Sequence, residues 1–174
     1  MSRRAPSLIA SEGGSAAVEM ALVTPLLLTL MFGSFEMGNY FLDNHVVAKA
    51  VRDGARYASR RSFTEYTCST VTSDVVDKTR NLIRTGQLTG GTARLPGWTD
   101  PATITVSVAC NTTGNNGSAF SGIYNGVATG APVVTVSASV PYHSLFGVIG
   151  FSSPSLSFNS ITLNARSQAP VMGI

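Results

Sequence analysis

Residues 13–36 read Gly-Gly-Ser-Ala-Ala-Val-Glu-Met-Ala-Leu-Val-Thr-Pro-Leu-Leu-Leu-Thr-Leu-Met-Phe-Gly-Ser-Phe-Glu, and this stretch decides the fold. Between Ala16 and Phe35 the only charged residue is Glu19. An apolar helix of about 20 residues can cross the roughly 30 Å hydrocarbon core of a membrane. We therefore expect a membrane-spanning helix here. Inserting a carboxylate costs about 2.5–3.5 kcal/mol, so Glu19 is expected to have a partner or a specific role.

Two ordinary membrane signals explain less of this segment. A secretory signal peptide has an apolar region of 7–15 residues followed by a small-x-small cleavage site. The apolar run here is longer, and the nearest Ala-x-Ala, Ala48-Lys49-Ala50, lies well beyond its end. An uncleaved single-span anchor accounts for the length, but it leaves Gly14 and Glu19 unexplained. It stays open as the alternative.

The helical pattern continues past the apolar stretch. Residues 37–61 contain no proline, and apolar or small residues recur about every 3.6 positions, at Val47, Ala48, Val51, Ala55 and Ala58. This spacing predicts one helix from about Ser15 to about Arg60. We divide the N-terminal region, residues 15–62, into a membrane half at about 16–36 and an aqueous half at about 37–62.

Four residues of this helix are expected to shape its packing. Pro25 removes a backbone hydrogen bond and should kink the membrane half. Ser34 and Gly38 form a small-x-x-x-small pair, which allows another helix to approach closely. Gly54 lowers helix propensity by about 1 kcal/mol, so its presence suggests a packing reason.

Residues 63–174 are predicted to form an exported α+β domain. After a turn at Phe63–Ser69, a helix is expected at Val71–Arg84, with Gly86 as its stop signal. Alternating apolar and polar residues predict three strands of a small antiparallel sheet, at Thr103–Ala109, Pro132–Tyr142 and Leu156–Arg166.

Two connecting segments complete the predicted layout. Asn111–Gly130 is rich in Gly, Asn and Ser without periodicity, so we expect a long exposed loop. Leu145–Phe151 is an apolar connector that could cover the sheet or touch a neighbour. The expected fold class is α+β: a long, partly transmembrane helix followed by a small antiparallel sheet.

The two cysteines, Cys68 and Cys110, both fall in the part expected outside the cytoplasm, where a disulfide can form. Closing a loop of about 40 residues would stabilise the fold by roughly 3–4 kcal/mol. Two buried free thiols are the alternative. Their spacing fits no zinc site, because only His45 and His143 could add nitrogen ligands.

Composition argues against several functions. Charged residues make up 12% of the chain and the net charge is +3, with arginines clustered at 52–61. Basic and aromatic residues do not interleave as in nucleic-acid-binding proteins. Nucleophile, zinc-protease and phosphate-loop motifs are absent from the sequence, so we predict no catalytic residues, cofactor, metal or small-molecule substrate.

Four sequence blocks, in order, resemble the TadE-like family. They are Ala17-Val18-Glu19, Pro25-Leu26-Leu27, the run from Phe32 to Gly38, and the run from Ala50 to Ala58. Family members are minor pilins, or pseudopilins, of the bacterial tight-adherence (Tad, Flp) pilus and secretion system. A glycine followed five residues later by a glutamate is also the layout of type IV pilin precursors, so the resemblance implies a type IV pilin-like fold.

The resemblance implies processing by a prepilin peptidase. Residues 1–14 would be a leader removed after Gly14, so that Ser15 carries a new ammonium group. Glu19 of a neighbouring subunit could pair with that ammonium and set the register between helices.

The resemblance also implies partners and a location. The partners would be membrane lipid, the peptidase, other minor and major pilins, and Tad assembly-platform proteins. The location would be the bacterial inner membrane, crossed once, with the C-terminal domain in the periplasm or outside the cell. An anchored adhesin or binding module that never joins an assembly is the competing interpretation.

Overall fold

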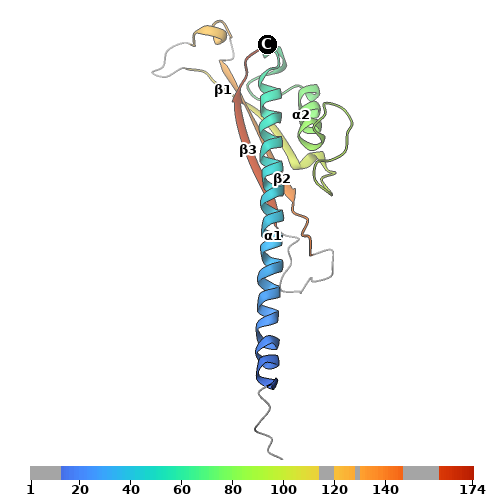
Figure 1. Ribbon diagram of the computed structural model, residues 1–174. Coiled ribbons are helices and arrows are strands. Elements are labelled where there is room, and N and C mark those ends of the chain that lie inside the picture. The colour runs from blue at the N-terminus through green and yellow to red at the C-terminus, as the bar shows by residue number, and fades with distance from the viewer. Residues whose placement is uncertain (1–12, 114–119, 128–129, 147–160) are drawn as a thin grey trace, which may run out of the picture. The chain divides into compact units, whose positions relative to one another are not determined.

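The computed structural model describes residues 13–113, 120–127, 130–146 and 161–174. In this part of the chain, helix α1 (Gly13–Ser59) and helix α2 (Ser73–Thr85) precede a three-stranded antiparallel sheet (Figure 1). The strands are β1 (Ile104–Asn111), β2 (Ala131–Pro141) and β3 (Thr162–Pro170), in the order β1-β2-β3. Short 3-10 turns are η1 (Phe63–Glu65), η2 (Pro101–Thr103) and η4 (Gly122–Tyr124). The predicted α+β class is confirmed.

The chain divides into two compact units, Met1–Gly38 and Asn39–Ile174. Helix α1 runs through both units and continues without interruption through Pro25. The second unit holds the sheet, α2 and the C-terminal part of α1.

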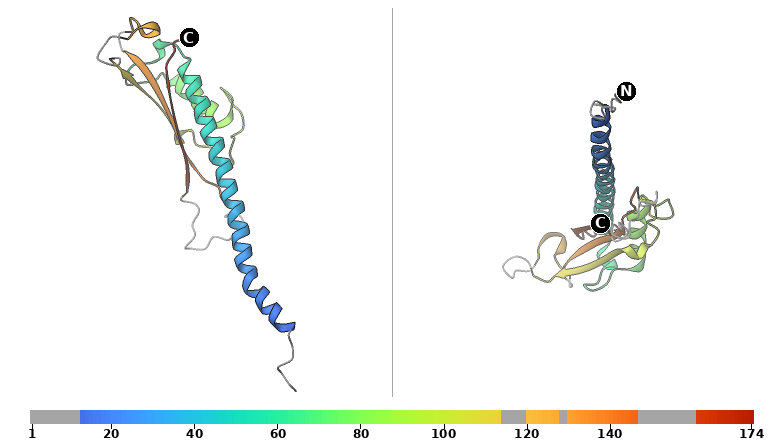
Figure 2. Two further views of the ribbon diagram at one scale, coloured as in Figure 1. Left: turned by 60° about the vertical axis from the view of Figure 1, so that its left-hand side comes forward. Right: turned by 90° about the horizontal axis from the view of Figure 1, so that it is seen from below.

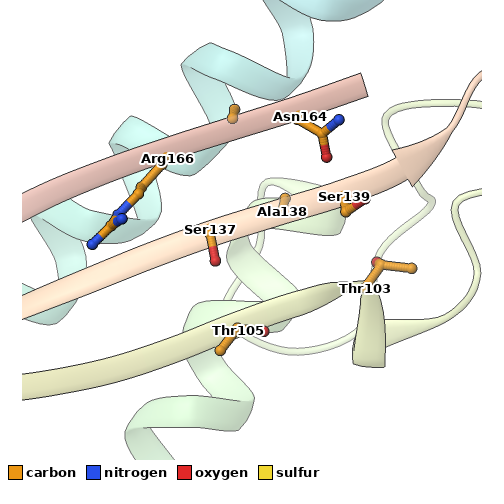
Figure 3. Close-up of a pocket in the computed structure, with 8 residues that line it drawn as sticks. Thr103, Thr105, Ser137, Ala138, Ser139, Asn164 and Arg166 are labelled. Carbon is orange, nitrogen blue, oxygen red and sulfur yellow. The ribbon is translucent and has the colours of Figure 1, made fainter. Parts of the chain in front are cut away.

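The sheet has one apolar face and one polar face. Ile104 lies opposite Ala138, and Val108 lies opposite Val134. Because successive residues of a strand point to opposite faces, every second residue, such as Thr105 and Ser107 in β1, lies on the other face. That outer face carries mostly hydroxyl and amide side chains. Figure 3 shows Thr105, Ser137, Ser139 and Asn164 among them, and the register adds Ser107, Thr135 and Gln168.

Both helices of the second unit contribute to one core with the apolar face of the sheet. The left view of Figure 2 shows the strands running alongside the C-terminal part of α1. Buried core residues come from α1 (Val47, Ala50, Val51, Ala55, Ala58), from α2 (Val75, Ile83) and from the sheet (Ile104, Val134, Val136, Val140, Leu163). The alanine side chains of α1 at this interface are small, so the distance between the helix and its neighbours can be short.

Helix α2 packs directly over Gly54. A Cβ atom on Gly54 would overlap Cγ1 and Cδ1 of Ile83 and would lie 3.4 Å from Cγ2 of Thr79. Ile83 and Thr79 are fully buried, so neither side chain has free space to move into. Gly54 is therefore the point where α2 approaches the backbone of α1.

Helix α2 ends at Gly86, as the sequence predicts. Gly86 has φ of 85°, and its N–H donates to the carbonyl of Leu82 at 2.8 Å. Glycine occupies this left-handed position without the steric cost that a Cβ would bring.

The third strand differs from its prediction, which was Leu156–Arg166. Strand β3 begins at Thr162 and continues to Pro170, because β2 supplies partners as far as Val133, which pairs with Pro170. Residues 156–160 of the predicted strand and 147–151 of the predicted connector lie outside the described residues.

The segment expected as an exposed loop, Asn111–Gly130, is anchored at one aromatic residue. Tyr124 is half-buried, its ring lies 5.9 Å from the ring of Phe63, and its hydroxyl donates to the carbonyl of Val171 at 2.9 Å. The expectation of full exposure is therefore wrong at Tyr124. Residues 114–119 and 128–129 of this segment lie outside the description.

A disulfide joins Cys68 to Cys110, with their Cα atoms 5.1 Å apart. Cys68 lies in the turn between η1 and α2, and Cys110 lies near the end of β1. The same turn is also tied to α1, because the Tyr66 hydroxyl donates to the carbonyl of Ala58. The turn thus links the end of the long helix to the edge of the sheet.

We expect the double variant Cys68→Ser/Cys110→Ser to lose about 3–4 kcal/mol of unfolding free energy, because the disulfide lowers the conformational entropy of the unfolded chain. Denaturant unfolding of the wild type, with and without reductant, gives the reference. A tryptic digest should contain one linked peptide pair that reduction separates. Quantitative alkylation of both thiols in unreduced, denatured protein would contradict the bridge.

We expect Gly54→Leu to destabilise the second unit by about 1–3 kcal/mol, because the new side chain overlaps buried Ile83. Gly38→Leu is the matched control, since a Cβ at Gly38 meets no atom within 4 Å. Thermal unfolding in detergent, followed by circular dichroism, measures both. Equal unfolding temperatures for the two variants would show that α2 does not need the gap at Gly54.

Candidate functional site

The first unit consists, in its described part, of the N-terminal portion of α1. Its large apolar side chains are exposed around the whole circumference, and they include Val18, Met20, Leu22, Leu26, Leu27, Leu30, Met31, Phe32 and Phe35. Among the described residues α1 is the one helix long and apolar enough to cross a membrane, and none of its most apolar window is buried. In water such a surface would be strongly unfavourable, so it needs lipid or partner helices around it.

Polar side chains within this apolar portion bond to the helix itself. The hydroxyl of Thr24 donates to the carbonyl of Met20 at 2.6 Å, and the hydroxyl of Thr29 donates to the carbonyl of Pro25 at 2.8 Å. These bonds satisfy the hydroxyl hydrogens without water, which a hydrocarbon environment requires. Thr24 and Thr29 are therefore compatible with burial in lipid.

The residues expected to take part in processing lie in the first turns of α1. Gly14, Ser15 and Glu19 are all exposed. Ser15 and Glu19 are four residues apart, which is one helical turn, so they share a face. A Cβ on Gly14 would meet no described atom within 4 Å, so packing against the described residues does not require a glycine there.

The small pair expected to admit another helix is open. Ser34 and Gly38 are exposed, and a Cβ built on Gly38 has no atom within 4 Å. The hydroxyl of Ser34 donates to the carbonyl of Met31 at 2.7 Å, which leaves the helix surface smooth. Gly33 is open in the same way.

The predicted residues do not form one site. Gly14, Ser15, Glu19, Pro25, Ser34 and Gly38 lie in the first unit, whereas Gly54 and the pair Cys68 and Cys110 lie in the second. Gly54 faces α2 in the core, and the cysteines join a turn to the sheet. The latter three residues thus have structural partners within this chain.

One contact of the second unit was missed by the sequence reasoning. The Asn39 amide Nδ2 donates to the hydroxyl of buried Tyr142 at 3.1 Å, and the ring of Tyr40 packs edge-on against that of Tyr142 at 5.3 Å. These contacts fasten the start of the aqueous half of α1 to the end of β2. The signal in the sequence is that Tyr142 is the last residue of the predicted strand Pro132–Tyr142, one residue beyond the end of β2.

A titratable pair lies near this contact. Partial burial of Asp43 raises the pKa of its carboxyl above the ordinary value, and the nearby imidazole of His143 acts in the opposite direction. The imidazole also fills the space beside Gly97, where a Cβ would overlap it. Gly97 has φ of 75°, so glycine suits both the backbone and the contact.

The described residues offer no evident catalytic centre. They contain no group of three or more His, Cys, Asp or Glu residues that could hold a metal ion. A shallow groove of about 360 Å³ lies on the outer face of the sheet, lined by Thr103, Thr105, Ser137, Ala138, Ser139, Asn164, Ala165 and Arg166 (Figure 3). Its polar side chains are hydroxyls, one amide and one guanidinium, and no general base accompanies the hydroxyls.

Comparison with known proteins gives one family whose sequence model matches the N-terminal helix. The family model described as TadE-like protein matches residues 14–56, a range that lies entirely within α1. Among curated proteins and among solved structures no match is found. The resemblance seen in the sequence is therefore confirmed.

Over residues 14–56 the chain is thus similar to a family associated with the tight-adherence pilus, and among the described residues α1 is long and apolar enough to cross a membrane. The TadE-like, pilus-associated family is in general not enzymatic.

Proposed function

We propose that this chain is a minor pilin, or pseudopilin, that takes part in assembling or initiating a tight-adherence pilus through its membrane helix. The observation that carries the proposal is one acidic residue, Glu19, five positions after Gly14, in a stretch of α1, residues 16–35, that is otherwise uncharged and exposed. The family match covers the same segment. An anchor alone has no use for a carboxylate at that position.

The first step would be removal of the leader, residues 1–14, by a prepilin peptidase. The open surroundings of Gly14 support this, because a protease could reach the backbone there without displacing any described side chain. The mature chain would then consist of the N-terminal helical region, residues 15–62, and the domain of residues 63–174. That domain would lie in the periplasm or outside the cell, with the helix in the inner membrane.

The second step would be lateral association with other pilins and with the assembly platform. The ammonium of Ser15 and the carboxylate of Glu19 on neighbouring chains would neutralise each other in a low-dielectric environment and set the axial register. The exposed pair Ser34 and Gly38 would let helices approach closely at the other end of the membrane half.

An uncleaved, membrane-anchored adhesin or binding module is the second candidate. The polar outer face of the sheet, with its shallow groove around Arg166, is the surface that favours it. Processing and pilus formation distinguish the two candidates, because an anchored adhesin needs neither.

We expect Gly14→Lys to leave the leader attached, because a long charged side chain blocks access to the bond after residue 14. Gly14→Ala, which adds one methyl group, should still be processed at least partly. N-terminal sequencing of membrane-extracted protein measures both, with Ser15 as the expected first residue of the wild type. Recovery of an intact Met1 start from wild-type cells that contain the peptidase would refute processing.

We expect Glu19→Gln to insert and to be processed normally, because removing a charge from a membrane helix favours insertion. It should nevertheless give few crosslinked complexes with pilus components and reduced piliation, since the pairing with Ser15 is lost. Asp77→Asn, an equal charge change at an exposed position of α2, is the control and should behave as wild type. Full piliation by Glu19→Gln would show that Glu19 has no role in assembly and lies in the headgroup region without a partner subunit.

A further inference from the structure

One face of α1 in the second unit carries a row of basic side chains. We call it the basic face, and it consists of His45, Lys49, Arg52, Arg56 and Arg60. All five side chains are exposed. Spacings of four, three and four residues place the first four on one side of α1. Arg60 follows in the turn directly after the helix ends at Ser59.

The opposite side of the same helical stretch is the buried one. Val47, Val51 and Ala58 are completely buried, as part of the core shared with α2 and the sheet. The helix is therefore held with the basic face turned away from its own domain. Any partner that approaches this part of α1 meets these five side chains.

Among the described residues no ion pair within 4.0 Å joins the basic face to an acid, although Asp53 lines a groove together with Arg56 and Arg60. The ion pairs found there use other cations: Arg61 pairs with Glu65 at 3.0 Å, and Lys78 pairs with Asp74 at 2.8 Å. Arg52 and Arg56 lie four residues apart in α1, where like charges destabilise a helix, and Arg60 adds a third positive charge just after the helix end. The isolated chain thus bears an electrostatic cost that an acidic partner would remove.

A shallow groove beside the basic face provides a place for a carboxylate. It has a volume of about 340 Å³ and is lined by Asp53, Arg56, Tyr57, Arg60 and Arg61. Arg61 is already held by Glu65, and its guanidinium lies 5.6 Å from the centre of the Tyr57 ring. Arg56 and Arg60 remain available to an incoming acid.

The surface changes from basic to apolar at its N-terminal end. Phe41 is 52% exposed and Leu42 is 68% exposed, although both belong to the second unit. From Phe41 to Arg60 the surface extends for about 30 Å along the helix, at 1.5 Å per residue. A partner helix with apolar residues at one end and carboxylates along the rest would match it.

Membrane lipid and a second copy fit this surface less well. Lys49 lies about 20 Å of helix beyond residue 36, the predicted end of the membrane half, whereas charges are screened over roughly 8 Å at physiological salt. Two copies packed symmetrically through this face would bring like charges together. An acidic surface on another protein is the remaining partner that matches both the positive charge of the basic face and its length along α1.

We propose that the face of α1 from Phe41 to Arg60 is a docking surface for an acidic helix of a different protein. The inference deepens the proposed function, because such a protein would be another component of the same assembly. The docking itself uses neither Gly14 nor Glu19. It can therefore be tested separately.

Binding can be measured by fluorescence anisotropy with the full-length protein in neutral detergent. The probe is a labelled helical peptide with leucines at one end and glutamates at four- and three-residue spacing. A scrambled peptide of the same composition is the reference. We expect the spaced peptide to bind at least about tenfold more tightly than the scrambled one, and Arg56→Glu to weaken it about tenfold. Gln87→Glu/Gln168→Glu, which makes the same change in net charge at two exposed residues outside both grooves, should change binding less than about twofold.

Three outcomes would overturn the docking proposal. Equal binding of the two peptides would mean unspecific attraction. An equal loss with Arg56→Glu and with Gln87→Glu/Gln168→Glu would mean that only net charge matters. The protein can also be placed in neutral nanodiscs and offered phosphatidylglycerol vesicles or the spaced peptide. Binding to the vesicles but not to the peptide would assign the face to lipid. Both variants change exposed residues, and unchanged thermal unfolding verifies that each is folded.

A cellular measurement separates this inference from the proposed function. Arg52→Glu/Arg56→Glu should give a normal Ser15 N-terminus but reduced piliation, whereas Gln87→Glu/Gln168→Glu should give normal piliation. Normal piliation by the double variant would refute docking while leaving the minor-pilin proposal intact. A Met1 start in the wild type would refute the minor-pilin proposal and leave the peptide measurement valid.

Discussion

The close packing of α1 against α2 and the sheet is the constraint on which the second unit depends. Alanines and a glycine on one side of α1 let the neighbouring elements approach to backbone distance, with Ile83 of α2 directly over Gly54. This contact fixes the rotation of α1 about its own axis relative to the sheet. The other sides of the helix are consequently exposed to solvent or available to a partner.

The consequences for function follow from that rotation. Once the alanine side is buried, the arginines at 52, 56 and 60 must point outward. At the N-terminal end of the same unit, Asn39 and Tyr40 bind Tyr142 and hold the start of the aqueous half to β2. The chain thus joins a helix that needs an apolar environment to a domain whose outer surfaces are polar or basic.

Much of the fold could be predicted because its signals are local. The apolar length of residues 16–35 and the alternation in β1 and β2 depend only on the order of residues along the chain. Gly86 ends α2 as expected, since a left-handed turn needs no distant partner. The boundary of β3 was not predictable in this way, because its extension to Pro170 is set by the pairing with Val133. Tyr124 was placed in a loop for the same reason: its contacts with Phe63 and Val171 are distant in sequence.

The sequence by itself determined the apolar helix, its lone glutamate and the family resemblance, since these are properties of one continuous segment. The site residues Gly14, Ser15 and Glu19 could be named for that reason, and the structure adds that they are exposed on the first turns of α1. Tertiary structure alone decided what Gly54 is for, that Cys68 reaches Cys110, and which side of α1 is presented outward. Those three properties depend on residues brought together by folding, and helical spacing alone does not say which face of a helix is buried.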